Sequence, residues 1–354
     1  MRSPSDPHGG YVTEIAFSAD GDHLLVGTAC FAVRVWGALS GEVMLFCPPL
    51  AGTNEDGGYH AGKLSCDIVA TPDRRLLMAA GSASGGIIVW DCSEGCRIAE
   101  LRNCGHPYGV PVPHLAAYPS GRYFLSADLD TIKVWWMDDF KCKRTLRSAF
   151  VVQILLVSDK DKYIFCAGQI EDKNKQKQKK PDGVVAVWPG HPEKKPIRLL
   201  RGFGRLVRSL YAPVDPDVLV TAGQDGRVKI WDVPTGQCRK AIWSKLAMAS
   251  PLAYAALVNR ARWLLTYSDD ASLQIWAVDS GKCLLTLATT SIGITPKFRL
   301  SASRCGRLVA VATGNRIQVI DFEVLADRSK AGRPGEPAAY LKHALRFIVT
   351  APST

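Results

Sequence analysis

Short runs of alternating apolar residues recur along the chain, and most of them close on a tryptophan. Ala32–Trp36 and Val228–Trp231 are two such runs. An alternation with a period of two is typical of β-strands. The closing residues are Trp36, Trp90, Trp135, Trp188, Trp231 and Trp276, and a further copy closes on Ile320-Asp321. They follow one another at intervals of 43 to 54 residues, which indicates a repeated structural unit.

Each copy contains four apolar segments separated by turn residues. A first segment such as Val12–Ser18 precedes a Gly or Asp turn, and a second such as Val218–Gly223 leads to the tryptophan segment. A turn such as Thr235-Gly236 and a fourth segment such as 282–287 follow. The unit is therefore predicted to be a four-stranded antiparallel sheet, with strands a to d in chain order. Such a sheet has two apolar faces, and stacking copies around a ring buries both.

The period, the Trp90-Asp91 and Trp231-Asp232 pairs and the Gly105-His106 pair resemble the WD40-repeat family. The resemblance covers about residues 8–322 and implies an all-β fold, a seven-bladed β-propeller of four-stranded antiparallel blades. We expect a short N-terminal lead at 1–10 and the propeller at 8–325. The expected blades span about 8–46, 62–101, 110–146, 150–200, 203–242, 250–287 and 292–322.

In the family that the chain resembles, a His, a Ser or Thr, an Asp and the Trp form a buried hydrogen-bond network in each blade. The resemblance places Asp225 and Asp270 at the Asp position, and His8 and His106 at the His position. Phe203 stands at the His position of the fifth blade, so that network is incomplete. Because no blade clearly carries the full set, we expect apolar packing to hold the blades together more than this network does.

Three insertions lengthen the loops of one face. In this fold the d–a loops, which join successive blades, and the b–c loops open on the same face. Residues 47–61 and 102–112 lie in d–a loops, and residues 169–183, a Lys-rich insertion that we expect to be disordered, lie in the b–c loop of the fourth blade. Insertions gathered on one face indicate a binding face. The alternative is that these loops simply tolerate insertion.

The chain carries a formal net charge of +11, which favours acidic partners such as RNA, an acidic protein or an anionic lipid surface. The 169–183 insertion has no apolar residue among its lysines, so it would form an electrostatic arm, a nuclear-import signal or merely a solvated loop. Three arginines follow near the same face. The candidate partner-binding residues are Lys173, Lys175, Lys177, Lys179, Lys180, Arg201, Arg205 and Arg208.

The closure of the ring is predicted at the C-terminal end. Residues 323–343 have the Gly, Pro and charge content of a linker, and 344–350 reads as a strand. We therefore expect 345–350 to complete the seventh blade, in place of the N-terminal strand that the family uses. The alternative is a short helix at 338–345.

Several classes of chemistry lack their residues. Gly57–Lys63 matches the start of a phosphate-binding loop, but Leu64 follows where Ser or Thr is needed. Cys96, Cys142, Cys238 and Cys283 recur at one place in separate repeats, which is not a metal cluster. We expect no cofactor, no metal and no catalytic constellation. The absence of an apolar membrane-spanning run or secretory segment, with eleven cysteines, favours an intracellular protein of the cytoplasm or nucleus.

These observations favour a non-catalytic scaffold that binds proteins through the d–a/b–c face within a larger complex. The basic residues make a ribonucleoprotein or RNA-processing assembly the first expectation. The alternative is a substrate receptor of a cullin-type ubiquitin ligase. Receptors of that class carry Arg or Lys two residues after the Asp of Trp-Asp, and Ser93 and Pro234 stand there instead.

Overall fold

The computed structural model describes residues 12–18, 20–28, 33–47, 67–71, 76–80, 87–92, 94, 96–101, 114–170, 182–191, 195–243, 251–269, 272–288, 298–313, 316–322 and 348–350. Strands dominate these residues, and the 3₁₀ turn η1 (Asp159–Asp161) lies among them. In this described part of the chain, no helix is long and apolar enough to cross a membrane.

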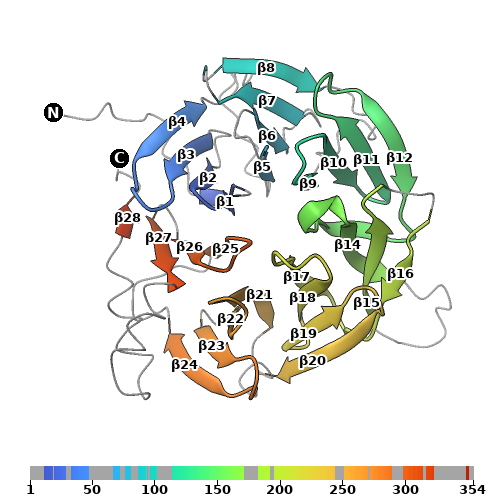
Figure 1. Cartoon of the computed structure of the whole chain (residues 1–354), viewed down its shortest axis with the longest axis vertical. Coiled ribbons are helices and arrows are strands. Elements are labelled where there is room, and N and C mark those ends of the chain that lie inside the picture. Colours follow the sequence, from blue (N-terminus) through green and yellow to red (C-terminus); the bar gives the residue numbers. More distant parts are fainter. Residues whose placement is uncertain are drawn as a thin grey trace, which may run out of the picture.

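Consecutive strands pair into antiparallel sheets of four, and the sheets stand around a central axis (Figure 1). The first half of the chain forms three of them. They are β1 (Val12–Phe17), β2 (His23–Thr28), β3 (Val33–Gly37) and β4 (Val43–Cys47); β5 (Ile68–Ala70), β6 (Leu76–Ala80), β7 (Ile87–Asp91) and β8 (Cys96–Leu101); and β9 (His114–Ala117), β10 (Tyr123–Asp128), β11 (Thr131–Trp136) and β12 (Cys142–Arg147).

The remaining sheets follow the same order. They are β13 (Val151–Val157), β14 (Tyr163–Ile170), β15 (Asp182–Pro189) and β16 (Arg198–Leu200); β17 (Val207–Tyr211), β18 (Val218–Gly223), β19 (Arg227–Asp232) and β20 (Gln237–Trp243); β21 (Leu252–Val258), β22 (Trp263–Ser268), β23 (Ser272–Ala277) and β24 (Cys283–Ala288); and β25 (Phe298–Ala302), β26 (Leu308–Thr313), β27 (Arg316–Asp321) and β28 (Ile348–Thr350). In each sheet whose first strand is labelled in Figure 1, that strand lies innermost. The prediction of an all-β propeller with four-stranded antiparallel blades is confirmed; we number the blades in chain order.

Apolar side chains fill the spaces between neighbouring blades. Val220 and Ile230 of blade 5 pack with Ala256 and Leu264 of blade 6 in one buried cluster. The same kind of cluster joins the two ends of the chain, since Leu24 and Trp36 of blade 1 pack with residues of β26 and β27 in the last blade. Each sheet therefore buries both faces against its neighbours, as the two apolar faces of the repeat require.

The outer strand of the last blade comes from the far C-terminal end of the chain. Within β28, Ile348 and Val349 pair with Gln318 and Ile317 of β27. The rest of the predicted 344–350 strand lies outside the described residues, as do the 1–10 lead, the 323–343 linker and the alternative helix at 338–345.

The predicted 169–183 insertion is shorter at both ends than expected. Strands β14 and β15 pair as far as Gln169 with Gly183 and Ile170 with Asp182. These four residues therefore belong to the paired part of the hairpin. Residues 171–181 lie outside the described part of the chain, and so do most residues of the 47–61 insertion and all of the 102–112 insertion.

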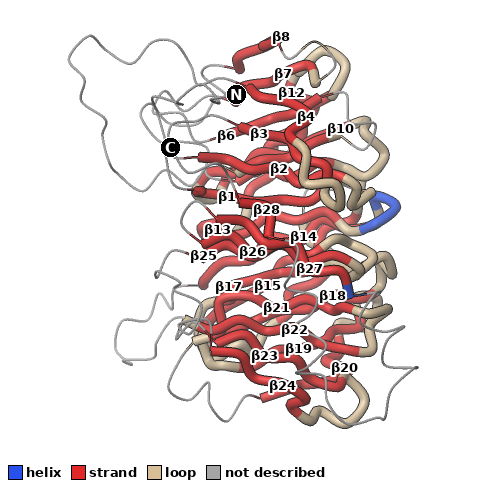
Figure 2. Tube along the Cα trace, turned by 90° about the vertical axis from the view of Figure 1, so that its left-hand side faces the viewer, coloured by secondary structure: helices blue, strands red, loops and turns tan. Residues whose placement is uncertain are grey.

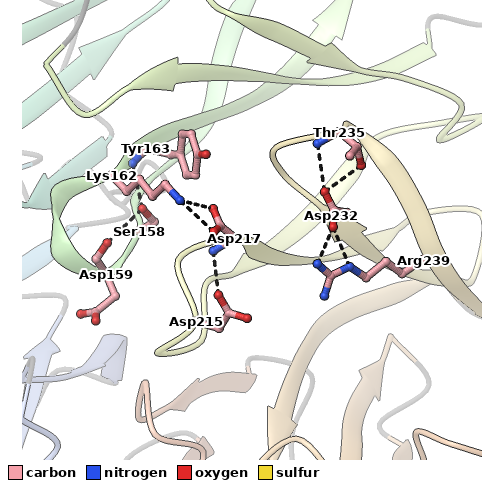
Figure 3. Close-up of polar contacts among 9 residues, drawn as sticks. All are labelled: Ser158, Asp159, Lys162, Tyr163, Asp215, Asp217, Asp232, Thr235 and Arg239. Carbon is pink, nitrogen blue, oxygen red and sulfur yellow. Dashed lines mark hydrogen bonds and ion pairs between the residues drawn. The ribbon is translucent and has the colours of Figure 1, made fainter.

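The propeller has two different faces. The d–a and b–c connections lie on what we call the upper face, and the a–b and c–d turns lie on the lower face. The 3₁₀ turn η1, blue on the right-hand side of Figure 2, marks the lower face. Turns of neighbouring blades bind one another on the lower face. Lys162 Nζ of blade 4 lies 2.6 Å from Asp217 Oδ1 of blade 5 (Figure 3), and Tyr118 of blade 3 donates its hydroxyl to Gly190 O of blade 4 at 2.9 Å.

The lower end of the central channel is crossed by a side chain. Arg304 lies in the β25–β26 turn of the last blade and donates from Nη2 to Val157 O of blade 4 at 3.2 Å. Its Nη1 lies 3.7 Å from Asp159 Oδ1. Tyr211 of blade 5 donates its hydroxyl to Ser303 O in the same turn, at 3.0 Å. Blades 4, 5 and 7 are thereby linked across the channel.

Candidate functional site

Three of the closing tryptophans make the same hydrogen bond within their blade. The indole nitrogen of Trp231 donates to Thr221 Oγ1 at 2.9 Å, Trp276 to Thr266 Oγ1 at 2.9 Å, and Trp135 to Ser126 Oγ at 2.8 Å. In each case the hydroxyl belongs to the strand-b residue that pairs with the residue two before the tryptophan. These tryptophans are therefore structural residues that tie strand c to strand b.

Blades 1, 2 and 4 lack the hydroxyl, and in blade 2 the residue at this position is Ala79. Val26 occupies the corresponding position in blade 1 and Cys166 in blade 4. The buried indole nitrogens of Trp36 and Trp188 accordingly have no hydrogen-bond partner among the described residues. Trp90 of blade 2 is also buried, at the end of an apolar strand. Apolar packing thus holds blades 1 and 4 where the polar pair is missing.

The predicted Asp and His positions are described only in part. Phe203, at the His position of blade 5, packs against Trp231 with the ring centroids 5.4 Å apart, so an apolar contact stands where the family has a hydrogen bond. Asp225 lies at the turn between β18 and β19, where its carboxylate accepts the backbone N–H of Arg227 at 3.1 Å. Burial raises the pKa of Asp225. Asp270, His8 and His106 lie outside the described residues.

Four ionisable side chains form an arc along the innermost strands of blades 1, 2, 3 and 7. They are Glu14, Asp67, His114 and Arg299. Their places are equivalent, because each precedes the strand-a residue whose partner in strand b stands at the hydroxyl position described above. Arg299 Nε lies 3.5 Å from Glu14 Oε2 and donates to Thr13 O at 2.6 Å. His114 Nδ1 lies 3.5 Å from Asp67 Oδ2. Arg299 therefore joins the last blade to the first with polar contacts.

Glu14 has the most perturbed carboxyl group of this arc. Burial and the carboxylate of Asp67 raise the pKa of Glu14 from 4.5 to about 8, against the opposing effect of Arg299. The Glu14 side chain keeps 27% of its surface exposed. No group of three or more His, Cys, Asp or Glu side chains among the described residues could hold a metal ion. On blades 3, 5 and 6 the recurring cysteine faces the tryptophan of its own blade, so these thiols lie on separate sheets.

The five candidate lysines, Lys173, Lys175, Lys177, Lys179 and Lys180, lie outside the described residues. Arg201 and Arg205 are exposed in the d–a loop that leads into blade 5. The backbone of Arg205 lies against the base of the blade 4 hairpin, because a Cβ on Gly183 would meet Arg205 O at 2.2 Å. The d–a loop and the hairpin that carries the lysines are thus adjacent on the upper face.

Arg208 differs from the other two arginines. It is exposed at the start of β17, but its Nη2 donates to Asp269 Oδ1 of blade 6 at 3.3 Å. This ion pair directs Arg208 toward blade 6 and neutralises part of its charge. Two further cations lie closer to the loop. Lys229 donates from Nζ to Gly202 O, and Arg227 Nε lies 3.8 Å from Asp225 Oδ2.

An exposed tryptophan stands beside these cations and was not expected from the sequence. Trp243 ends β20 with 50% of its surface exposed, and the guanidinium carbon of Arg227 lies 5.2 Å from the ring centroid. The two residues are partners in the β19–β20 register. The sequence carries no signal for this exposure, because the alternation of β20 does not show whether a loop covers the residue at the end of the strand.

A second unusual surface is the outer strand of blade 1. Val43, Met44 and Phe46 of β4 are exposed at 51%, 60% and 43%, and Leu39 in the preceding turn is exposed at 58%. β4 is the last strand of its sheet, so one edge of its backbone faces outward. The outer strands of the other blades expose fewer large apolar side chains among the described residues.

Comparisons with known proteins agree with the repeat. The family model of the WD domain, G-beta repeat, matches residues 5–37 and 194–232. WD repeat-containing protein 18 of Homo sapiens is 22% identical over 268 residues, which are 70% of this chain and 55% of that protein. Transducin beta-like protein 3 of Rattus norvegicus is 24% identical over 58% of this chain and 25% of that protein.

Autophagy-related protein 16 of Arabidopsis thaliana is 24% identical over 310 residues, which are 87% of this chain and 55% of that protein. The chain therefore spans about half, or less, of the length of these curated relatives. The repeated tryptophan strands, the four-stranded blades and the similarity to WD-repeat proteins together show that this chain belongs to the WD40-repeat family.

Proposed function

We propose that this chain is a non-catalytic scaffold, a closed ring of seven blades that holds a protein partner within a larger complex. Two observations support the ring: the four-stranded sheets recur to β28, and the last blade contacts the first through both apolar packing and Arg299. A rigid ring of this kind holds surface elements of different blades at fixed positions. WD40 propellers are in general scaffolds of this kind.

The observation that carries the proposal is the exposed apolar surface of β4. Three large side chains on one outer strand are costly to leave in water, since covering apolar area stabilises by about 25 cal/mol per Å². No described strand pairs with the outer edge of β4. A partner segment that adds as an extended strand, with apolar side chains over Met44 and Phe46, would satisfy both features.

The sequence-based expectation of docking on the upper face stays a proposal, because most of its insertions lie outside the described residues. A ribonucleoprotein or RNA-processing assembly is the setting that we propose, on the basis of the net charge of +11, with a location in the cytoplasm, the nucleus or both. A cullin-type substrate receptor is the weaker alternative, because Pro234 follows Asp232 where that class carries a basic residue.

The docking proposal is tested by quantitative affinity purification of three chains: the wild type, Met44→Glu and Leu284→Glu. Leu284 is the matched control, since it is exposed at 37% on the outer strand β24 of blade 6. Met44→Glu should deplete a protein that the wild type and Leu284→Glu both retain, with or without ribonuclease. An unchanged set of partners for Met44→Glu would contradict docking at β4.

A further inference from the structure

We propose that the upper face of blade 5, beside its border with blade 4, binds single-stranded nucleic acid. Trp243 provides a platform for stacking a base, and Arg201, Arg205 and Arg227 contact phosphates. This site is separate from the apolar surface of β4, so neither proposal depends on the other.

The platform is an indole that folding leaves half uncovered. Its neighbour along β20, Ile242, is buried between blades 5 and 6, so the alternation of the strand turns Trp243 to the opposite side. Arg227 on the adjoining strand β19 lies at cation–π distance from the ring. An exposed aromatic ring with a guanidinium beside it is the pairing that base stacking and phosphate binding require together.

Further cations surround this pair through a chain of contacts. Arg227 is joined to Asp225, and a Cβ on Gly204 would lie 3.8 Å from Asp225 Oδ2, which places the loop of Arg201 and Arg205 beside the same turn. Lys229 Nζ holds that loop at Gly202 O. The loop therefore has a fixed position close to Arg227, and its two arginines are exposed.

The charges in this region favour a polyanion. Asp225 pairs with Arg227, and the nearby Asp269 pairs with Arg208. Arg201 and Arg205 form no ion pair with any described residue. Cations therefore outnumber carboxylates around Trp243 among the described residues.

Trp136 offers a comparison with Trp243, because it is also an exposed tryptophan with a cation beside its ring. Trp136 is 37% exposed on the lower face, and Lys143 Nζ lies 4.2 Å from its ring centroid. That lysine also donates to Tyr123 Oη at 2.7 Å, and Asp138 and Asp139 lie in the turn after Trp136 and Met137. The surplus of exposed arginines therefore distinguishes the surroundings of Trp243 from those of Trp136.

A single strand is the form that fits. Stacking on Trp243 needs an unpaired base whose face is free, and a duplex buries its base faces. The same chemistry could be supplied by RNA or by single-stranded DNA, and an acidic protein segment would use the arginines but not the indole.

The experiment is fluorescence anisotropy of the full chain at constant salt with labelled probes. The probes are a 15-nucleotide oligouridine, the matching oligothymidine, an abasic 15-mer with the same phosphates, and polyglutamate. The variants are Trp243→Ala, Trp243→Phe, Arg205→Gln and the control Trp136→Ala, and circular dichroism with thermal unfolding establishes that each is folded.

We expect Trp243→Ala to weaken binding of the oligouridine about five- to hundred-fold, the effect of losing one stacked base. Trp243→Phe should keep most of the affinity, Trp136→Ala all of it, and the abasic probe should bind Trp243→Ala and wild type alike. Arg205→Gln should reduce the slope of log affinity against log salt by about 0.7. A preference between oligouridine and oligothymidine identifies RNA or DNA as the source.

Unchanged oligouridine affinity in Trp243→Ala would overturn the proposal. So would an equal loss in Trp136→Ala, or polyglutamate binding as tight as that of the oligonucleotide with no dependence on Trp243, which would assign the surface to an acidic protein. If the Trp243→Ala variant proves unfolded, the comparison of Trp243→Phe with Arg205→Gln on the intact and abasic probes decides in the same way.

Discussion

Arg304 of the last blade donates to Val157 O of blade 4 across the central channel, at 3.2 Å. The two residues are 147 positions apart in the chain. Burial lowers the pKa of the Arg304 guanidinium, and the carboxylate of Asp159 opposes that effect. The contact therefore links opposite sides of the ring through a side chain that gives up much of its hydration.

Replacing this arginine should loosen the ring. Arg304→Met removes the cross-channel hydrogen bond and leaves Asp159 without this partner, so we expect the free energy of unfolding to fall by about 1–3 kcal/mol. Urea denaturation measures it. The control is Arg307→Met in the same turn, where the arginine pairs with Asp321 at the surface and the change should stay within about 0.5 kcal/mol. Equal effects of the two substitutions would contradict a special role for Arg304.

The tryptophan–hydroxyl pairs predict a reciprocal change in two blades. Thr221→Val removes the acceptor of Trp231 and should destabilise by about 1–2 kcal/mol. Val26→Thr offers an acceptor to the indole nitrogen of Trp36, which has no hydrogen-bond partner among the described residues. The free energy of this new hydrogen bond should offset the cost of burying a hydroxyl. The comparison is Val220→Thr, a fully buried valine next to the pair, which gains no such donor and should destabilise. Thermal unfolding measures the stability of the three variants. The prediction is wrong if Val26→Thr destabilises the chain as much as Val220→Thr does.

The raised pKa of Glu14 predicts a dependence of stability on pH. Between about pH 4.5 and 8 the folded chain holds the Glu14 proton more tightly than the unfolded chain does. The contribution of Glu14 to stability is thus fully present below pH 4.5 and is lost as the pH rises toward 8. Glu14→Gln keeps the neutral form at every pH, so its unfolding free energy should fall less over this window. Glu42→Gln, on an exposed turn, should retain the slope of the wild type; a wild-type slope in Glu14→Gln would show the prediction to be wrong.

The strands and blades could be predicted because the repeat determines them locally. Each tryptophan closes an alternating segment of its own blade. Thr221 and Thr266 stand ten residues before their tryptophans, and this constant spacing makes the hydrogen bond predictable from the sequence. The contacts between blades could not be predicted in this way. Asp269 pairs with Arg208 across 61 residues, and the alternation gives no sign of it.

The candidate binding residues also include some that the sequence indicates and one that it does not. Net charge and spacing indicate a basic region, and Arg201 and Arg205 are indeed exposed there. The exposure of Trp243 escapes a sequence rule, because an apolar residue at the end of a strand is as often covered by the next loop as left open. The role that we propose for Trp243 rests on this exposure and on the position of Arg227 beside the ring.

The most direct test of the scaffold is hydrogen–deuterium exchange of the chain alone and in a purified complex with the partner that Met44→Glu depletes. If the partner adds to the edge of blade 1, backbone amides of Val43–Cys47 should exchange more slowly in the complex, while those of Cys283–Ala288 in blade 6 keep their rates. Unchanged exchange along Val43–Cys47, with protection elsewhere on the ring, would contradict the account.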